Sequence, residues 1–224
     1  MNYRSAIANT ISSTNLLFGI LSIIATFEGK FTIAALMIVL AVVADSLDGR
    51  VARALGVSGE FGKELDSLCD VCSFGVAPGI LIYQYALVDI GLVGKLLAAF
   101  FAVCGALRLA RFNVNASVVQ GYFVGMPIPA GGCIVSAYVM SGYQFSTIVV
   151  ALGTAIVAVI MYSEIKFPDF KGKGNPLYPQ PVILAVAAGL YMLYQRPVAW
   201  PFVIMFTYTL AGMANHLYVK LKNK

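Results

Sequence analysis

Charged residues are scarce in this chain: Asp, Glu, Lys and Arg make up 11% of its 224 residues, whereas 60% are hydrophobic. A soluble domain of this length exposes far more charge, so a soluble enzyme and a nucleic-acid-binding domain are both excluded. The mean hydropathy of +0.85 is typical of a protein that crosses a membrane several times. We therefore expect an all-α polytopic membrane protein with no nucleic-acid partner.

Histidine and cysteine are also rare, which narrows the possible soft-metal and redox sites. The single histidine, His216, falls near the end of the last apolar segment, where we interpret it as an interfacial side chain. All four cysteines, Cys69, Cys72, Cys104 and Cys133, fall within apolar segments. Cys69 and Cys72 have CxxC spacing, but redox or zinc chemistry requires accessible thiols. We expect all four to be small apolar helix residues.

Turn residues divide the apolar sequence into about eight predicted membrane spans. Helices satisfy their own backbone hydrogen bonds in a bilayer, and the chain lacks the alternating pattern of a membrane β-barrel. The segment before the first span is polar, so we expect no cleaved signal peptide. The predicted spans are residues 9–27, 31–54, 63–87, 91–112, 124–142, 146–163, 179–195 and 199–218.

Basic residues are distributed unevenly between the two sides of this arrangement. Lys30, Lys95 and Arg196 fall on one side, and the remaining twelve of the 15 Lys and Arg residues fall on the other. The positive-inside rule then places both termini in the cytoplasm of a multi-pass protein of the cell membrane. The net charge of +5 reflects this orientation and contact with anionic membrane lipids.

Four of the six aspartates lie within 26 residues, as Asp45, Asp48, Asp66 and Asp70. Each carboxylate at membrane depth costs about 2.5–3.5 kcal/mol, so the group predicts a functional site. Residues three or four apart share a helix face, and a glycine-bounded turn between the pairs lets them face each other. Hard oxygen ligands select Mg²⁺, Mn²⁺ or Ca²⁺, and two such ions suit phosphoryl or phosphatidyl transfer.

Small residues and an arginine alternate with these aspartates. Gly49, Ala52 and Gly62 leave room for a nucleotide against the backbone, and the planar guanidinium of Arg53 suits a diphosphate. A simpler interpretation pairs the aspartates with nearby basic residues at a helix boundary. That interpretation explains one or two aspartates but not four at these spacings.

The complete pattern, D-x2-D-G-x2-A-R-x8-G-x3-D-x3-D, runs from Asp45 to Asp70. It resembles the CDP-alcohol phosphotransferase signature at every fixed position. The resemblance implies a homodimeric enzyme with a six-helix core, here residues 9–165, followed by two additional helices over residues 179–218 of a single catalytic domain, 1–224. It further implies two divalent cations (Mg²⁺ or Mn²⁺), a CDP-linked lipid substrate and release of CMP.

The same resemblance assigns roles to individual residues. Asp70 lies at the metal site and acts as the general base on the acceptor hydroxyl. The implied metal ligands are Asp45, Asp48, Asp66 and Asp70, and the implied CDP-lipid contacts are Asp48, Gly49, Ala52, Arg53 and Gly62.

Three further segments, beginning at Asp70, Arg108 and Gly125, read D-x-x-S-F-G-x-A-P, R-L-A-R-F-N and G-x-P-x-P-A. They are similar to the phosphatidylserine synthase branch, which implies CDP-diacylglycerol as donor and L-serine as acceptor. The expected serine contacts are Arg108, Arg111, Ser73 and Asn113. Asn9 and Asn15 are candidate nucleotide contacts, although Ala8 stands where the family has proline.

Two alternatives remain at this point. A relative within the family would use glycerol phosphate or inositol phosphate as acceptor, or an archaeal ether-linked CDP-lipid as donor. A protein of another class, a divalent-cation transporter, would also place carboxylates in a membrane.

Overall fold

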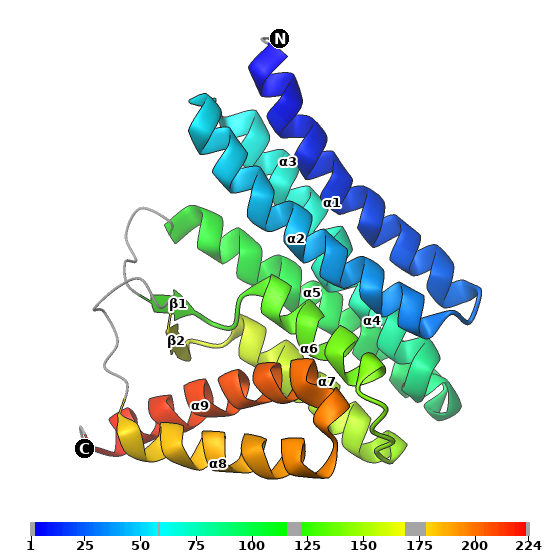
Figure 1. Cartoon of the computed structure of the whole chain (residues 1–224), viewed down its shortest axis with the longest axis vertical. Coiled ribbons are helices and arrows are strands. Elements are labelled where there is room, and N and C mark those ends of the chain that lie inside the picture. Colours follow the sequence, from blue (N-terminus) through cyan, green and yellow to red (C-terminus); the bar gives the residue numbers. More distant parts are fainter. Residues whose placement is uncertain (1–2, 58, 116–121, 169–177, 223–224) are drawn as a thin grey trace.

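The computed structural model describes residues 3–57, 59–115, 122–168 and 178–222, most of which are helical (Figure 1). The helices are α1 Tyr3–Phe27, α2 Phe31–Leu55, α3 Glu60–Asp70, α4 Ala77–Ile82, α5 Leu92–Asn115, α6 Ile128–Met140, α7 Thr147–Tyr162, α8 Pro179–Gln195 and α9 Trp200–Lys222. Because α3 and α4 are joined by further helical turns, they form one rod, and the eight resulting rods correspond to the eight predicted spans.

The rod that contains α3 and α4 changes its helical geometry along its length. A π-helical segment, Val71–Val76, separates α3 from α4, and a second one, Tyr83–Leu87, follows α4. A 3₁₀ turn, Val88–Ile90, ends the rod. Wide π turns are rare and occur frequently at functional sites, and here the first begins directly after Asp70.

Five of the helical segments are long and apolar enough to cross a membrane: Asn9–Phe27, Phe31–Val51, Glu60–Ile90, Leu92–Asn115 and Pro197–Lys222. Helices α6 and α7 are apolar but shorter, with 13 and 16 residues. The chain is therefore a multi-pass membrane protein, as its composition predicts.

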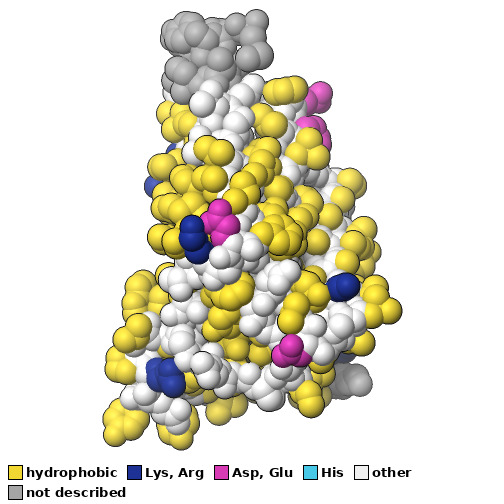
Figure 2. Space-filling model, turned by 90° about the vertical axis from the view of Figure 1, so that its right-hand side faces the viewer, with side chains coloured by type: hydrophobic (Ala, Val, Ile, Leu, Met, Phe, Trp, Pro, Cys, Tyr) yellow, Lys and Arg dark blue, Asp and Glu magenta, His cyan; other side chains and the backbone are white. Residues whose placement is uncertain are grey.

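The surface of the protein supports this conclusion. Figure 2 shows hydrophobic side chains spread over one face, with few charged ones among them. Large apolar side chains point outward along the long helices, including Leu17 (52% exposed), Leu96 (60%) and Ile204 (53%). Apolar surface of this extent is stable only in contact with lipid or another apolar surface.

The bundle is arranged around α6 and the rod of α3 and α4. Helix α1 packs against α2 and α3, and α2 also packs against α6. Helices α8 and α9 pair with each other, and α9 packs on α6 (Figure 1). The C-terminal pair is therefore attached to the core through α9.

A two-stranded antiparallel sheet was not expected from the sequence. Strands β1, Tyr122–Val124, and β2, Lys166–Pro168, pair with Phe123 opposite Phe167. The predicted span 124–142 accordingly begins later, at Ile128, after an extended segment. The Phe167 ring is fully buried and packs against Tyr208 of α9, with 5.6 Å between ring centroids. The sheet thus links the core to the C-terminal helices.

Candidate active site

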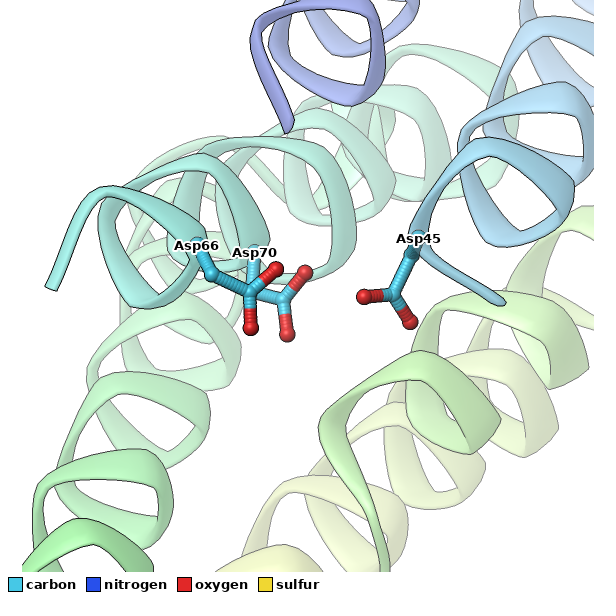
Figure 3. Close-up of side chains that lie close together, drawn as sticks. All are labelled: Asp45, Asp66 and Asp70. Carbon is cyan, nitrogen blue, oxygen red and sulfur yellow. The ribbon is translucent and has the colours of Figure 1, made fainter. Parts of the chain in front are cut away.

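Three aspartate side chains converge from two helices. Asp45 comes from α2, whereas Asp66 and Asp70 come from α3, and one carboxylate oxygen of each lies within 4.8 Å of the others (Figure 3). Asp66 and Asp70 are four residues apart, so they project from the same side of α3. Gly56, with φ of +66°, lies just after α2 where the chain reverses toward α3. Local sequence therefore brings the two helices together at the carboxylates.

The group has the properties of a divalent-cation site. Asp70 is buried, Asp45 and Asp66 are half-buried, and Oδ1 of Asp66 is buried without a hydrogen-bond partner among the described residues. Three carboxylates this close repel one another unless a cation balances their charge, and a buried polar atom normally has a partner. Oxygen ligands of this kind suit Mg²⁺, Mn²⁺ or Ca²⁺. The residues present therefore fit the cation that the sequence pattern implies.

Asp48 lies apart from this group. It is buried one turn beyond Asp45, accepts a hydrogen bond from the Ser12 hydroxyl of α1, and is not among the carboxylates that meet within 4.8 Å. Its charge is nevertheless close enough to act on Asp45 and Asp66. Its role as a fourth metal ligand stays a prediction.

Helix α1 contributes two polar contacts to the aspartates, one from Asn15, which the sequence analysis named, and one from Ser12, which it did not. Asn15 Nδ2 donates to Asp70 Oδ1 at 2.9 Å, and Ser12 donates to Asp48. Ser12 and Asn15 are three residues apart, so they share a face of α1. Two buried polar residues at this spacing in an apolar span are the signal that points to them. The structure places Asn15 against a carboxylate, whereas a nucleotide contact was expected.

Arg108 of α5 is buried, with 4% of its surface exposed. Its Cζ lies 5.0 Å from the centroid of the Phe112 ring, and its charge acts on Asp70. Its Nε is buried without a hydrogen-bond partner among the described residues. A buried guanidinium with an unpaired donor next to a candidate metal site fits an anionic ligand.

Arg111, three residues further along α5, has hydrogen-bond partners within the protein. Its Nη2 donates to the carbonyl oxygen of Ser163 at 2.7 Å and to that of Val124 at 3.4 Å, and its Cζ lies 5.0 Å from the Tyr162 ring centroid. These contacts tie α5 to β1 and to the end of α7. The two arginines therefore have different surroundings, although the sequence presents them as a pair.

The other two predicted serine contacts also have partners within the protein. Ser73 is buried and donates to the carbonyl oxygen of Asn15 at 3.0 Å. Asn113 Nδ2 donates to the Ser67 hydroxyl at 2.7 Å, which ties the end of α5 to α3.

The predicted CDP-lipid contacts lie on α2 and α3 beside the aspartates. Gly49 and Gly62 are half-buried, and a Cβ added to Gly62 would meet only Asn9 Oδ1 at 3.8 Å among the described residues. Ala52 and Arg53 continue α2, but their side chains lie outside the described part of the structure. An open backbone at Gly62 allows the close approach that the sequence pattern predicts.

Comparison with known proteins gives relatives along most of the chain. The CDP-diacylglycerol–serine O-phosphatidyltransferase of Helicobacter pylori strain J99 is 33% identical, covering 96% of this chain and 92% of its own. The Bacillus subtilis protein of the same name is 38% identical, covering 76% of this chain and 93% of its own. Archaetidylserine synthase of Methanothermobacter thermautotrophicus is 41% identical, covering 75% and 72%.

A family-level comparison agrees with these relatives. The sequence model of CDP-alcohol phosphatidyltransferases matches residues 5–162, which include the aspartate pattern and reach the end of α7. Given this match and the identity with several relatives, the chain belongs to the CDP-alcohol phosphatidyltransferase family.

Proposed function

We propose that this chain transfers the phosphatidyl group of CDP-diacylglycerol to the hydroxyl of L-serine, giving phosphatidylserine and CMP. The observation that carries the proposal is the convergence of Asp45, Asp66 and Asp70, with the buried Arg108 close enough for its charge to act on Asp70. The names of the relatives support serine as the acceptor. We assign the reaction to a single catalytic domain over residues 1–224.

The cofactor fits the donor set of the site. The family depends on divalent cations, and we propose two, Mg²⁺ or Mn²⁺, held by Asp45, Asp48, Asp66 and Asp70. Ions held there would supply positive charge against the diphosphate and the departing CMP. Gly49, Ala52, Arg53 and Gly62, together with Asp48, would line the CDP-lipid site.

The residues of the chain then carry the proton and orient the acceptor. Asp70 accepts the proton of the serine hydroxyl while the serine oxygen forms a bond to the lipid-side phosphorus. The bond from that phosphorus to the CMP oxygen breaks, and CMP leaves with the electron pair. Holding serine and the phosphorus in contact accounts for much of the rate enhancement, because the entropy of bringing the two reactants together is lost on binding and not in the chemical step.

Arg108 is the proposed contact of the serine carboxylate. A guanidinium binds a carboxylate through two parallel hydrogen bonds, and Arg108 has an unpaired donor beside Asp70. Ser73, Arg111 and Asn113 would shape the same pocket through the backbone and side-chain contacts that they make.

The test is competition among acceptors. Purified wild-type protein with CDP-diacylglycerol should prefer serine over glycerol 3-phosphate and inositol phosphate.

Arg108→Gln should raise the KM for serine about 10- to 100-fold, which corresponds to the free energy of one lost charge-assisted hydrogen bond. Arg111→Gln should instead lower the melting temperature, because Arg111 ties together three elements. Phosphatidylglycerol phosphate as the main product would contradict serine as the acceptor, and an unchanged serine KM in Arg108→Gln would contradict the role of that residue.

Location and assembly complete the proposal. We propose that the site faces the cytoplasm from the cell membrane, because serine and CMP are water-soluble and the basic residues gather on that side. We also propose a homodimer, which the family resemblance supports.

A further inference from the structure

Asn15 joins the first helix to the proposed catalytic carboxylate through one hydrogen bond and to Ser73 through a second. Its Nδ2 donates to Asp70 Oδ1 at 2.9 Å, and its backbone carbonyl accepts from the Ser73 hydroxyl at 3.0 Å. Asn15 is fully buried, as is Ser73. One residue of α1 is therefore held at both its side chain and its backbone by residues 70 and 73.

Local geometry explains why these two residues meet Asn15. The π-helical segment Val71–Val76 begins directly after Asp70 and includes Ser73. Gly19, one turn beyond Asn15 on α1, lets the helices approach, since a Cβ there would lie 2.9 Å from Ser73 Cα. The close approach at Ser73 thus requires a glycine at position 19 of α1.

The amide of Asn15 has no other partner among the described residues. Its Oδ1 is buried and makes no hydrogen bond there. An unpaired polar atom of this kind is costly, and an apolar side chain of the same size would avoid that cost. The single hydrogen bond to Asp70 is thus the contact that the asparagine makes and that a leucine would not.

We propose that Asn15 is a positioning residue that fixes the side-chain rotamer of Asp70. The Asn15 amide donates a hydrogen bond to Oδ1 of Asp70, which restricts rotation of the carboxylate. Oδ2 of Asp70 then points in one direction. This rests on the proposed function, in which Asp70 accepts the proton of the acceptor. Asn15 acts only through Asp70, so its loss has no effect once the carboxylate is gone.

A double-mutant cycle tests this dependence. Asn15→Leu should lower kcat about 10- to 100-fold, the usual effect of removing a residue that orients a ligating side chain. The KM values for serine and CDP-diacylglycerol should stay within about threefold. Combined with Asp70→Asn, Asn15→Leu should cause no further loss. Ser13→Ala, on the exposed side of the same helix, is the control and should leave kcat unchanged.

Gly19→Ala is a second variant that leaves Asn15 in place. Its methyl group should push α1 away from Ser73 and lower kcat without raising the KM for serine. Gly153→Ala of α7 is the matched control, because a Cβ there meets nothing within 4 Å among the described residues. Wild-type kcat in a folded Asn15→Leu protein, or a full additional loss on top of Asp70→Asn, would overturn the proposal.

Metal affinity separates this inference from the proposed function. If the wild-type protein releases no CMP with serine, the proposed function fails, and Mn²⁺ affinity measured by electron paramagnetic resonance still tests Asn15. Asn15→Leu should weaken Mn²⁺ binding about 10-fold, since Asp70 belongs to the carboxylate group. If the wild-type protein is inactive with serine and Asn15→Leu binds Mn²⁺ as tightly as the wild type, the positioning role is refuted.

Discussion

Asp70→Asn is expected to reduce kcat about 10²- to 10⁴-fold at saturating Mn²⁺, the usual contribution of a general base. The amide has nearly the same shape as the carboxylate but accepts no proton at neutral pH. Saturating Mn²⁺ matters because Asp70 also lies in the carboxylate group. Serine-dependent CMP release, measured over a range of Mn²⁺ concentrations, separates loss of the base from loss of the metal.

Asp89→Asn is the matched control for this substitution. Asp89 lies in the exposed 3₁₀ turn at the other end of the same rod, away from the carboxylate group. Its removal should leave kcat unchanged. Wild-type turnover of Asp70→Asn with metal bound would show that another group accepts the proton.

Asp66→Ala should have an effect of similar size through a different cause. Asp66 presents a buried oxygen that has no partner among the described residues and lies within 4.8 Å of two other carboxylates. Losing a residue that only supports a ligand weakens metal binding by up to about 100-fold. Losing Asp66, a direct ligand, should therefore weaken Mn²⁺ binding by more than that. Activity should then be negligible at millimolar Mn²⁺.

Electron paramagnetic resonance of bound Mn²⁺ measures this effect without turnover. Glu64→Gln is the control, because Glu64 lies on the same helix but is exposed. Chelation should abolish wild-type activity, and added Mn²⁺ should restore it. Asp66→Ala that binds Mn²⁺ with wild-type affinity would contradict the assignment of Asp66 as a ligand.

Much of the fold was predictable because membrane helices and the turns between them depend on local sequence, namely apolar segments and the turn residues that separate them. Each predicted span overlaps a helical rod of the structure. Strands β1 and β2 were not predictable, since each has three residues and is stabilised by contacts between distant segments. Phe167 shows the difficulty: it lies between Lys166 and Pro168 in a short segment, yet its ring is buried against Tyr208 of α9.

The candidate site was partly predictable for a geometric reason. Residues four apart in an α-helix differ by about 40° in direction, whereas residues three apart differ by about 60° the other way. Asp66 and Asp70 both lie in the carboxylate group, whereas Asp48, three residues after Asp45, accepts a hydrogen bond from Ser12 of α1, a contact that only the tertiary structure brings about.

Arg108 and Arg111 illustrate the same limit. They are three residues apart, and one lies by Asp70 while the other meets the Val124 and Ser163 carbonyls. Those carbonyl partners come from segments that only the tertiary structure brings together.

Serine-dependent release of CMP from CDP-diacylglycerol by the purified wild-type protein is the most direct measurement of the central claim. We predict release that requires both serine and Mg²⁺ or Mn²⁺, with phosphatidylserine formed in equal amount. Metal flux across proteoliposomes without any CMP release would contradict the claim and favour a divalent-cation transporter.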